Sequence, residues 1–270
     1  MKKIGIFDSG IGGLSIVTKL KDINLDKKII YIADNAYFPY GSKNEKIVVG
    51  RSSHLVKKLV ELGCEIIIVA CNTASSASLE HLRQSFSLPI IGIEPAVKPA
   101  SRFSKSGKML LLATPLTTSG NRLSMLEKNY VNNQQLFSLP MQGLAEQIEK
   151  ANIPKKEFLS EMKRTLDHYY DLGVDCLVLG CTHYHFLKNI LSEISPSHVK
   201  IFDSVDGVVN RLLQLLSEHI NPTQLYNENN LELIDCYVTG SITSFSKSIT
   251  NIMENYCDLP NLSIMKMNEG

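Results

Sequence analysis

The fold of this chain is indicated by the stretch Ile66-Ile67-Ile68-Val69-Ala70-Cys71-Asn72-Thr73, which resembles the later stretch Cys176-Leu177-Val178-Leu179-Gly180-Cys181-Thr182-His183. Each consists of an apolar run, a small residue, a cysteine and then side chains that form hydrogen bonds. Short apolar runs that are bounded by polar residues and rich in branched side chains are typical of buried strands in parallel sheets. Both cysteines are therefore expected at the carboxyl end of a strand.

The similarity extends to the residues around both stretches. The apolar runs Ile4–Gly10 and Leu110–Thr117 precede the two copies, and Ile90–Glu94 and Val199–Asp203 follow them. Between the runs, apolar residues recur at helical spacing. This alternation predicts an α/β protein with two similar doubly wound, mostly parallel-sheet domains, related by pseudo-symmetry with the active site between them.

The expected domains divide the chain unevenly. Residues 1–97 and 207–270 are expected to form the first domain and residues 98–206 the second, with a linker around Val97–Ser106. The segment after Asp206 has no counterpart in the repeat and is expected to return to the first domain. A polar segment, Asn221–Asn230, predicts a loop. The expected strands are Ile4–Phe7, Ile29–Ile32, Ile66–Ala70, Ile90–Ile93, Met109–Ala113, Cys176–Leu179, Val199–Phe202 and Tyr237–Thr239.

The composition is that of an ordinary globular protein. Of the 270 residues, 44% are hydrophobic and 20% charged, and the net charge is +1, which predicts a buried core and gives no sign of a nucleic-acid partner. No apolar run approaches the roughly 20 residues of a membrane span. The run Ile4–Phe7 is too short for a signal peptide and ends at Asp8, so a cytoplasmic location is expected.

The chain has six cysteines, and no two show the Cys-x-x-Cys spacing of zinc or dithiol sites. We expect neither a bound metal nor, in a reducing cytoplasm, a disulfide. A single cysteine is more often a small buried hydrophobe than a functional group. Cys71 and Cys181 differ because two similar halves would bring them to opposite sides of one cleft.

A facing pair of thiols suits the inversion of a carbon centre. One removes a proton from one face of the carbon, and the other delivers a proton to the opposite face of the planar carbanion. A thiol with a pKa of about 8.5 can act as acid or base near neutral pH. The α-proton of an amino acid is less acidic by on the order of ten pKa units, or roughly 14 kcal/mol. Fixed donors in a dry, closing cleft must therefore stabilise the developing charge.

Polar residues also follow the first expected strand. Asp8 could hold a substrate ammonium group, and Ser9 begins a glycine-rich turn with Gly10-Ile11-Gly12-Gly13. This turn lacks the G-x-G-x-x-G spacing of dinucleotide sites, so it is either a tight turn or an anion site at a helix N-terminus. The long aromatic loop Ala33–Gly41 is typical of a cleft wall.

The residues after each cysteine have two interpretations. Asn72 and Thr73 can cap the following helix or bind a substrate carboxylate, and both roles are compatible. The helix N-terminus would favour a thiolate at Cys71. Thr182 and His183 occupy the equivalent positions after the second cysteine, where the histidine could accept or supply a proton.

Together these residues resemble the glutamate racemases of the aspartate/glutamate racemase superfamily. The resemblance follows the family order over nearly the whole chain, and its two cysteine motifs are highly specific. It departs from the family pattern at His185, where proline is usual, and at Gly240-Ser241, where a Gly-Asp pair is usual. The motifs that carry it are Asp8-Ser9-Gly10-Ile11-Gly12-Gly13, Pro39-Tyr40-Gly41, Ala70-Cys71-Asn72-Thr73-Ala74, Gly92-Ile93-Glu94-Pro95-Ala96 and Gly180-Cys181-Thr182-His183-Tyr184.

The resemblance implies a cofactor-independent racemase that interconverts L- and D-glutamate and supplies D-glutamate for peptidoglycan in the cell wall. Cys71 would act on the D-isomer and Cys181 on the L-isomer, assisted by Asp8, His183 and Glu146. No pyridoxal phosphate or metal is implied, and a homodimer is the family expectation. The residues expected to line the substrate site are Asp8, Ser9, Tyr40, Gly41, Asn72, Thr73, Thr114, Thr117, Thr182 and His183.

Three alternatives stay open at this point. An aspartate racemase of the same superfamily would be separated only by substrate assays. A redox or metal-binding protein is disfavoured by the cysteine spacing. A two-lobed amino-acid-binding protein without catalytic activity would have little reason to place a cysteine at both matching strand ends.

Overall fold

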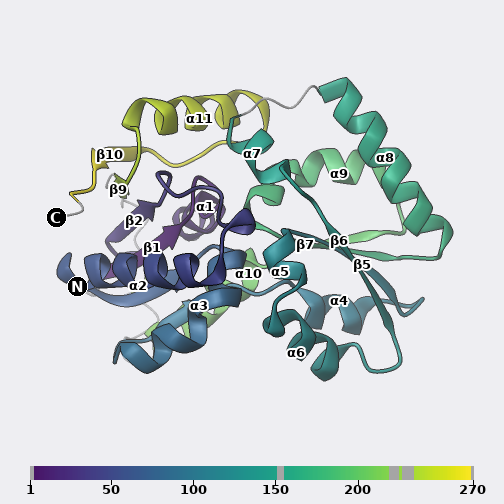
Figure 1. Ribbon diagram of the computed structural model, residues 1–270, viewed down its shortest axis with the longest axis horizontal. Helices are drawn as coiled ribbons and strands as arrows, with labels where there is room; N and C mark the ends of the chain where they lie inside the picture. Colours follow the sequence, from purple (N-terminus) through teal and green to yellow (C-terminus); the bar gives the residue numbers. More distant parts are fainter. Residues whose placement is uncertain (1–2, 151–154, 219–224, 227–233, 269–270) are drawn as a thin grey trace.

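The computed structural model describes residues 3–150, 155–218, 225–226 and 234–268 (Figure 1). Its strands are β1 (Lys3–Asp8), β2 (Ile29–Ala33), β3 (Cys64–Val69), β4 (Ile90–Gly92), β5 (Lys108–Ala113), β6 (Gln135–Pro140), β7 (Cys176–Gly180), β8 (Lys200–Phe202), β9 (Ile234–Val238) and β10 (Leu262–Lys266). Its helices are α1 (Leu14–Asp22), α2 (Glu45–Glu61), α3 (Asn72–Ser85), α4 (Val97–Phe103), α5 (Pro115–Thr118), α6 (Asn121–Tyr130), α7 (Leu144–Glu149), α8 (Lys155–Asp171), α9 (Lys188–Ile194), α10 (Val205–Ser217) and α11 (Ile242–Asn255), with short 3₁₀ helices η1 (Tyr40–Ser42) and η2 (Thr182–Leu187).

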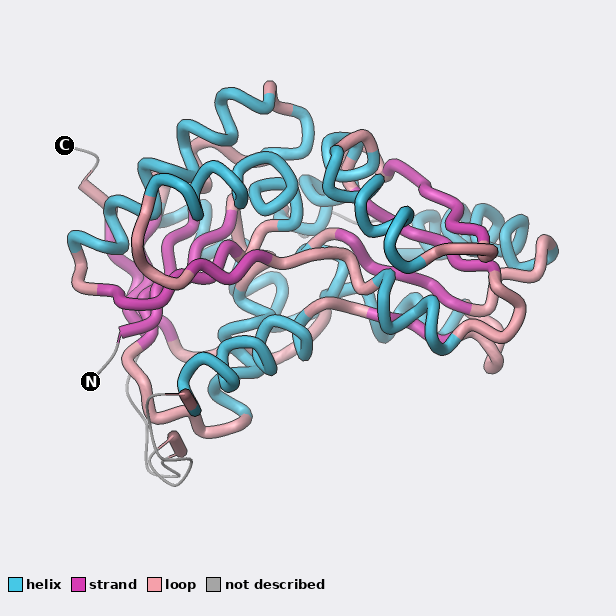
Figure 2. Tube along the Cα trace, turned by 90° about the horizontal axis from the view of Figure 1, so that it is seen from below, coloured by secondary structure: helices cyan, strands magenta, loops and turns pink. Residues whose placement is uncertain are grey.

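The strands form two separate sheets, which lie at opposite ends of the molecule (Figure 2). The larger has the order β10-β9-β2-β1-β3-β4 and the smaller the order β6-β5-β7-β8. All the strand pairs described are parallel. The predicted α/β class with parallel sheets is therefore confirmed.

The two sheets share one strand order. In both, the first strand of the repeat lies between the second and the third, as β2-β1-β3-β4 and β6-β5-β7-β8. This shared order is the pseudo-symmetry expected from the sequence repeat, with β3 equivalent to β7. It places the two cysteine-bearing strand ends at corresponding points.

Two edge strands, β6 and β10, were not among the predicted strands. In β6, Phe137 and Leu139 are only partly buried and Gln135 is exposed. An edge strand with a partly solvated face does not need a continuous apolar run, so its sequence lacks the pattern that marks a central strand. The tertiary pairing with β5 and β9 identifies both.

The expectation of a linker around Val97–Ser106 is wrong for most of its length, because Val97–Phe103 forms α4. Pro99 lies in the first turn of this helix, where the missing N–H has no partner to lose. Buried Val97 and Ala100 pack against α6 and the second sheet. Proline and serine thus mark a helix start here rather than an irregular connection.

The chain returns to the first sheet after the second one, as predicted. Helix α10 packs against α1 and β4, and β9 pairs with β2. Most of the predicted loop Asn221–Asn230 lies outside the described residues. Within it, Tyr226 forms a bridge with Leu25.

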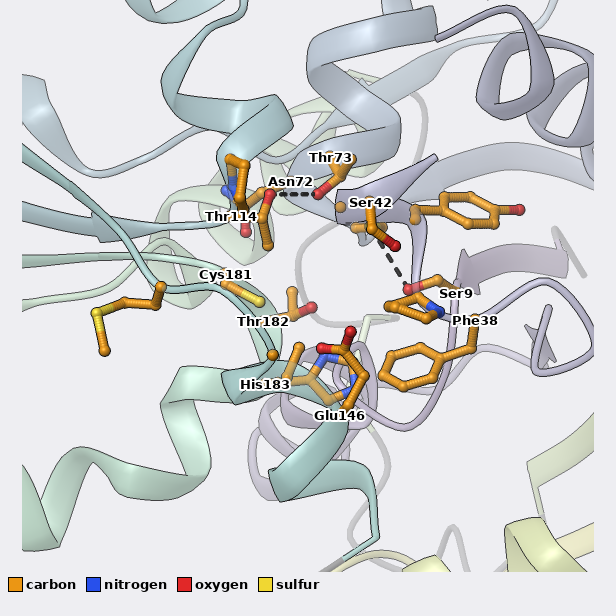
Figure 3. A pocket seen from close by; sticks show the side chains of 18 of the residues that line it. Ser9, Phe38, Ser42, Asn72, Thr73, Thr114, Glu146, Cys181, Thr182 and His183 are labelled. Carbon is orange, nitrogen blue, oxygen red and sulfur yellow. Dashed lines mark hydrogen bonds between the residues drawn. The ribbon is translucent and has the colours of Figure 1, made fainter. Parts of the chain in front are cut away.

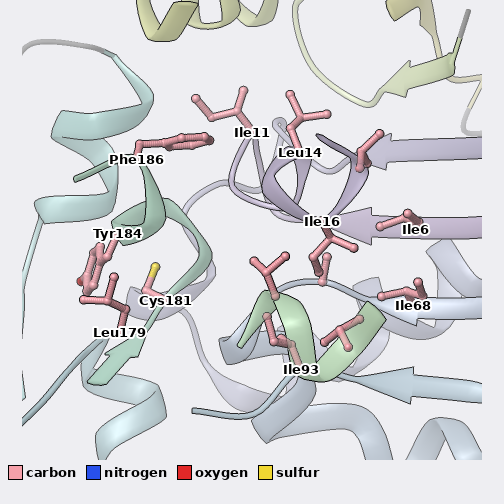
Figure 4. Packing of buried hydrophobic residues seen from close by; sticks show 14 of the residues in the cluster. Ile6, Ile11, Leu14, Ile16, Ile68, Ile93, Leu179, Cys181, Tyr184 and Phe186 are labelled. Carbon is pink, nitrogen blue, oxygen red and sulfur yellow. The ribbon is translucent and has the colours of Figure 1, made fainter. Parts of the chain in front are cut away.

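Alternating side chains of each strand enter different cores. In β3, Ile67 and Val69 pack beneath α2 and α3, whereas Ile66 and Ile68 join the core beneath α1 and α10. The core beneath α1 and α10 continues into the other sheet through β7, so one cluster of buried residues spans both halves. Figure 4 shows residues from both sides of it, including Ile11 of the glycine-rich turn and Phe186 of η2. The core thereby holds the two sets of strand ends against each other.

Candidate active site

A pocket lies between the carboxyl ends of the two sheets (Figure 3). The cavity volume is about 30 Å³, which holds a few water molecules and is too small for an amino acid. The cleft is therefore closed. Its lining residues are Ser9, Phe38, Pro39, Tyr40, Gly41, Ser42, Cys71, Asn72, Thr73, Thr114, Pro115, Met141, Gln142, Gly143, Ala145, Glu146, Cys181, Thr182 and His183.

Cys71 lies at the N-cap of α3 and is separated from the last residue of β3 by Ala70. Its sulfur accepts the Ala74 N–H at 3.5 Å and lies 3.8 Å from the Ser9 hydroxyl. Burial, together with the nearby negative Asp8, raises the pKa of the Cys71 thiol far above its ordinary value and outweighs the helix-end hydrogen bond. The closed site therefore keeps Cys71 as a neutral thiol, which is a proton donor. The helix N-terminus favours the thiolate of Cys71 as expected, through the Ala74 N–H, but desolvation outweighs this effect.

Asp8 ends β1 and lies beneath the glycine-rich turn, fully buried and outside the pocket lining. It accepts hydrogen bonds from the Gly10 N–H at 2.8 Å and from the Thr182 hydroxyl at 2.9 Å. Burial raises the pKa of the Asp8 carboxyl, while the charge of His183 and these hydrogen bonds oppose the rise. Asp8 thus joins the two halves through Thr182 and shapes the turn.

Cys181 follows β7, and His183 lies two residues later in η2. Burial by itself would lower the pKa of His183, but hydrogen bonds to Cys181 and Glu149, with the charge of Glu149, raise it well above the ordinary value. The imidazole Nε2 is 2.7 Å from the Glu149 carboxylate. The site therefore favours a protonated His183 beside the second cysteine.

Glu149 is one of the site residues that the sequence analysis missed. Glu146 lines the pocket as a member of α7, but the carboxylate bonded to His183 is that of Glu149, three residues later. The same Glu149 oxygen accepts the Ile11 N–H at 3.0 Å, from the turn of the other half. A helix places residues three apart on one face, so the sequence makes both carboxylates candidates and does not choose between them.

Glycines occur where the two halves approach most closely. A Cβ at Gly10 would lie 2.6 Å from the Glu149 carboxylate, and one at Gly12 would lie 2.4 Å from the Thr182 hydroxyl. A Cβ at Gly41 would lie 2.8 Å from that of Thr114. The absence of side chains at these three positions is what allows the cleft to close.

Three threonine hydroxyls meet across the pocket. Thr73 of α3 lies 2.9 Å from Thr114 and 3.4 Å from Thr117, which both belong to the second half. The adjacent Asn72 is buried, and its amide nitrogen and oxygen have no hydrogen-bond partner. These groups form a polar wall whose unsatisfied donors and acceptors can receive a polar ligand.

The comparisons with known proteins agree with this geometry. Residues 14–212 match the family model of the Asp/Glu/Hydantoin racemases. The chain belongs to this racemase family. It is 33% identical over 250 residues to the glutamate racemase of Clostridium perfringens, in a match that covers 92% of this chain and 96% of that protein.

Solved structures of racemases share the whole fold. The Escherichia coli glutamate racemase in complex with L-glutamate and the activator UDP-MurNAc-Ala superposes with a TM-score of 0.82 at 29% identity, covering 98% of this chain and 97% of that one. The Francisella tularensis glutamate racemase in complex with D-glutamate gives a TM-score of 0.79 at 26% identity, covering 99% and 98%. The two-sheet architecture is thus that of glutamate racemases.

The pocket of this racemase-family member contains most of the predicted site residues. Asp8 and Thr117 lie outside the lining, although each is hydrogen-bonded to a residue that lines it. Tyr40 lines the pocket, but its hydroxyl donates to Asp34. The predicted residues that line the pocket are Ser9, Tyr40, Gly41, Cys71, Asn72, Thr73, Thr114, Glu146, Cys181, Thr182 and His183.

Phe38 was not predicted to contribute. It reaches across the cleft from the loop after β2, and its ring centroid lies 5.2 Å from that of His183 (Figure 3). The contact packs an apolar ring against the imidazole. It therefore restricts the orientation of His183 and excludes water from one side of it.

The two departures from the family pattern are both accommodated. The His185 side chain in η2 is only 7% exposed and lies 3.8 Å from the Asp203 carboxylate, and this burial lowers the pKa of its imidazole to about 4. Ser241 caps α11, where its hydroxyl accepts the Ser244 N–H. A serine can cap a helix as an aspartate does.

The other cysteines lie away from the pocket. All six are free. Burial raises the pKa of Cys64 and that of Cys176 to about 12, and both lie at the start of core strands. In the part of the chain that the structure describes, no cluster of three or more His, Cys, Asp or Glu side chains is suited to a metal ion.

Proposed function

We propose that this member of the racemase family interconverts L- and D-glutamate by transfer of protons between the substrate and two cysteines. The observation that carries the proposal is the placement of Cys71 and Cys181, from equivalent strands of the two sheets, in one closed pocket. Relatives of the same fold bind L-glutamate and D-glutamate. A site that takes both mirror images needs a proton carrier for each face of the α-carbon.

The two cysteines differ in their surroundings, and this difference assigns the first step. Cys71 is a neutral thiol in the closed site, so it donates a proton. Cys181 lies two residues from His183, whose imidazole favours the protonated form and therefore places a positive charge beside the second cysteine. This form of the enzyme removes the α-proton of L-glutamate through Cys181 and returns a proton from Cys71 on the opposite face, which yields D-glutamate.

The reverse reaction uses the same groups in the opposite protonation state. Cys71 is then the thiolate, and its proton has moved to the substrate. Glu149 keeps His183 oriented toward Cys181 through the 2.7 Å contact in both states. Asp8 acts from beneath the turn by holding Thr182, and Glu146 supplies a carboxylate in the pocket wall.

Polar groups must stabilise the negative charge that develops on the substrate. The free amide of Asn72 and the hydroxyls of Thr73 and Thr114 lie on the wall next to the two cysteines. They bind the substrate carboxylates, together with Ser9 and Thr182. Groups already oriented in a dry site stabilise such charge without further reorganisation.

Substrate binding requires the cleft to open. The closed pocket has room for a few waters only, and entry therefore separates the two halves or moves the loop that carries Phe38. Closure then expels water and brings both thiols to the α-carbon. The proposed halves are residues 1–97 with 207–270 and residues 98–206.

The proposed cellular role is the supply of D-glutamate for peptidoglycan, which is the role of the glutamate racemase family. The enzyme is expected to act in the cytoplasm without a cofactor or metal, as a homodimer, and without nucleic-acid or membrane partners. Across the described residues, none of the helices is both long and apolar enough to cross a bilayer.

The test is racemisation of L- and D-glutamate by the purified chain with no added cofactor, alongside exchange of the α-hydrogen with deuterated water. Cys71→Ser and Cys181→Ser are each expected to lower racemisation by about a hundredfold to ten-thousandfold, the factor that general acid–base groups contribute. Full activity of either variant would contradict the two-base reaction. Faster turnover of aspartate than of glutamate would instead identify an aspartate racemase.

A further inference from the structure

A fully buried carboxylate, Asp34, lies just after β2 and takes no part in the steps described above. One of its oxygens accepts the Tyr40 hydroxyl and the Arg51 Nε–H at 3.0 Å. The other accepts the Arg51 Nη2–H at 2.7 Å and the Thr239 hydroxyl at 2.8 Å. Four hydrogen bonds therefore converge on one side chain.

This arrangement excludes a role for Asp34 as a proton carrier. Both carboxylate oxygens of Asp34 accept hydrogen bonds, and the bidentate contact with Arg51 balances the negative charge. Asp34 also does not line the pocket. A buried charge that is paired and fully hydrogen-bonded serves to hold its partners in one geometry. The function of Asp34 must therefore be sought in what its partners do.

The partners of Asp34 all hold the loop between β2 and α2. Tyr40 belongs to this loop, and the Arg51 guanidinium lies 4.0 Å from the ring centroid of Tyr37. Thr239, from the far end of the chain, also accepts the Ala36 N–H at 3.1 Å. The loop is thus fixed at three points around a single carboxylate.

The same loop forms one wall of the cleft and contacts the opposite half. Residues 38–42 line the pocket, Phe38 packs on His183, and the backbone at Gly41 is pressed against Thr114. A displacement of the loop would therefore open the substrate pocket while leaving Cys71 on α3 and Cys181 after β7 in place.

We propose that Asp34 is a positioning residue for substrate binding, which holds residues 35–42 in the shape that closes the pocket and ties this loop to Thr239 in the C-terminal segment. The inference rests on the proposed racemase function for its kinetic consequence, and on the hydrogen bonds alone for its effect on the loop. It assigns the Tyr40 hydroxyl to the support of the loop rather than to the substrate.

Two variants separate this role from a general effect on folding. Asp34→Asn keeps the size of the side chain but replaces a carboxylate oxygen with a donor that faces other donors. Thr239→Val keeps the shape and the Asp34–Arg51 pair, and removes only the hydroxyl that links Asp34 to the Ala36 N–H. Asp235→Asn is the matched control, since Asp235 pairs with Lys28 at 3.3 Å at the opposite end of the same sheet.

The experiment measures kcat and KM for D- and L-glutamate, together with hydrogen exchange of the amides at Ala36 and Tyr37. We expect Asp34→Asn to raise KM about tenfold or more with kcat within about threefold of the unchanged chain. Thr239→Val is expected to raise KM about threefold. Both should accelerate exchange at the two amides, and Asp235→Asn should change neither quantity.

Three results would overturn the proposal. These are unchanged exchange at Ala36 and Tyr37 in both loop variants, a KM within twofold of the original in both, or a loss confined to kcat. If the unaltered chain racemises neither glutamate nor aspartate, the proposed function fails by itself. The exchange comparison, which needs no activity and is made on whichever loop variant folds, then decides whether Asp34 holds the loop.

Discussion

The buried His185 makes a quantitative prediction about stability and pH. Its pKa is about 4 in the folded chain, because burial disfavours the charged imidazole; Asp203 opposes this effect, while Lys188 and His183 add to it. An unfolded histidine has a pKa of about 6.5. Since the folded-state pKa is depressed, the neutral form contributes stability that is present above pH 6.5 and is lost as the pH falls toward 4.

The size of the effect follows from the two pKa values. Between pH 7 and pH 5 the unfolded chain takes up about 0.7 of a proton at this position, and the folded chain takes up about 0.1. Linkage at about 1.36 kcal/mol per pKa unit then gives a loss of about 2 kcal/mol in the free energy of unfolding. Below pH 4 the loss at His185 approaches a limit of about 3.4 kcal/mol.

The assay compares urea unfolding of the original chain and of His185→Gln at pH 7 and pH 5. Glutamine has a similar size and does not titrate, so the variant should lose about 2 kcal/mol less than the original chain over this range. His198→Gln, at an exposed position, controls for the removal of a surface imidazole. Equal losses in the original chain and His185→Gln would refute the depressed pKa.

Three further predictions concern the site. Glu149→Gln should lower kcat for glutamate about tenfold to a hundredfold, because it weakens the support of His183; activity unchanged in a steady-state assay would exclude that role. Gly12→Ala should lower kcat/KM about a hundredfold, since its Cβ would lie 2.4 Å from the Thr182 hydroxyl and would keep the cleft from closing; normal kinetics would show that the closed state is not needed. The rate at which iodoacetamide alkylates Cys71, measured by mass spectrometry, should keep rising about tenfold per pH unit above pH 8.5, because the pKa of this thiol is raised. A rate that reaches a plateau near pH 8.5 would contradict the burial argument.

The pattern of the sequence was sufficient for the central strands and for the two cysteines. Strand β7 and residues Ile66–Val69 of β3 are buried on both faces, so their sequences are apolar, and such runs are visible without a structure. The repeat then placed Cys71 and Cys181 at equivalent strand ends. The chemistry of a facing thiol pair followed from residue type alone.

Contacts between distant segments depended on the tertiary structure. Asp34 and Thr239 are far apart in the chain, and nothing in either local sequence predicts their hydrogen bond. The choice of Glu149 over Glu146 as the partner of His183 depends on how α7 is rotated against η2. Both carboxylates occur on the same short helix, so the sequence pattern could not distinguish them.

The sequence by itself determined where most strands lie along the chain and that Cys71 and Cys181 follow two equivalent ones, because buried strands impose a local apolar pattern. Only the tertiary structure decided the pKa shifts of Cys71 and His183. These pKa shifts depend on desolvation and on charges brought close by folding, as Asp8 and burial act on Cys71 and as Glu149 acts on His183. Electrostatic effects depend on distance in space and on exclusion of water, and neither is encoded by position along the chain.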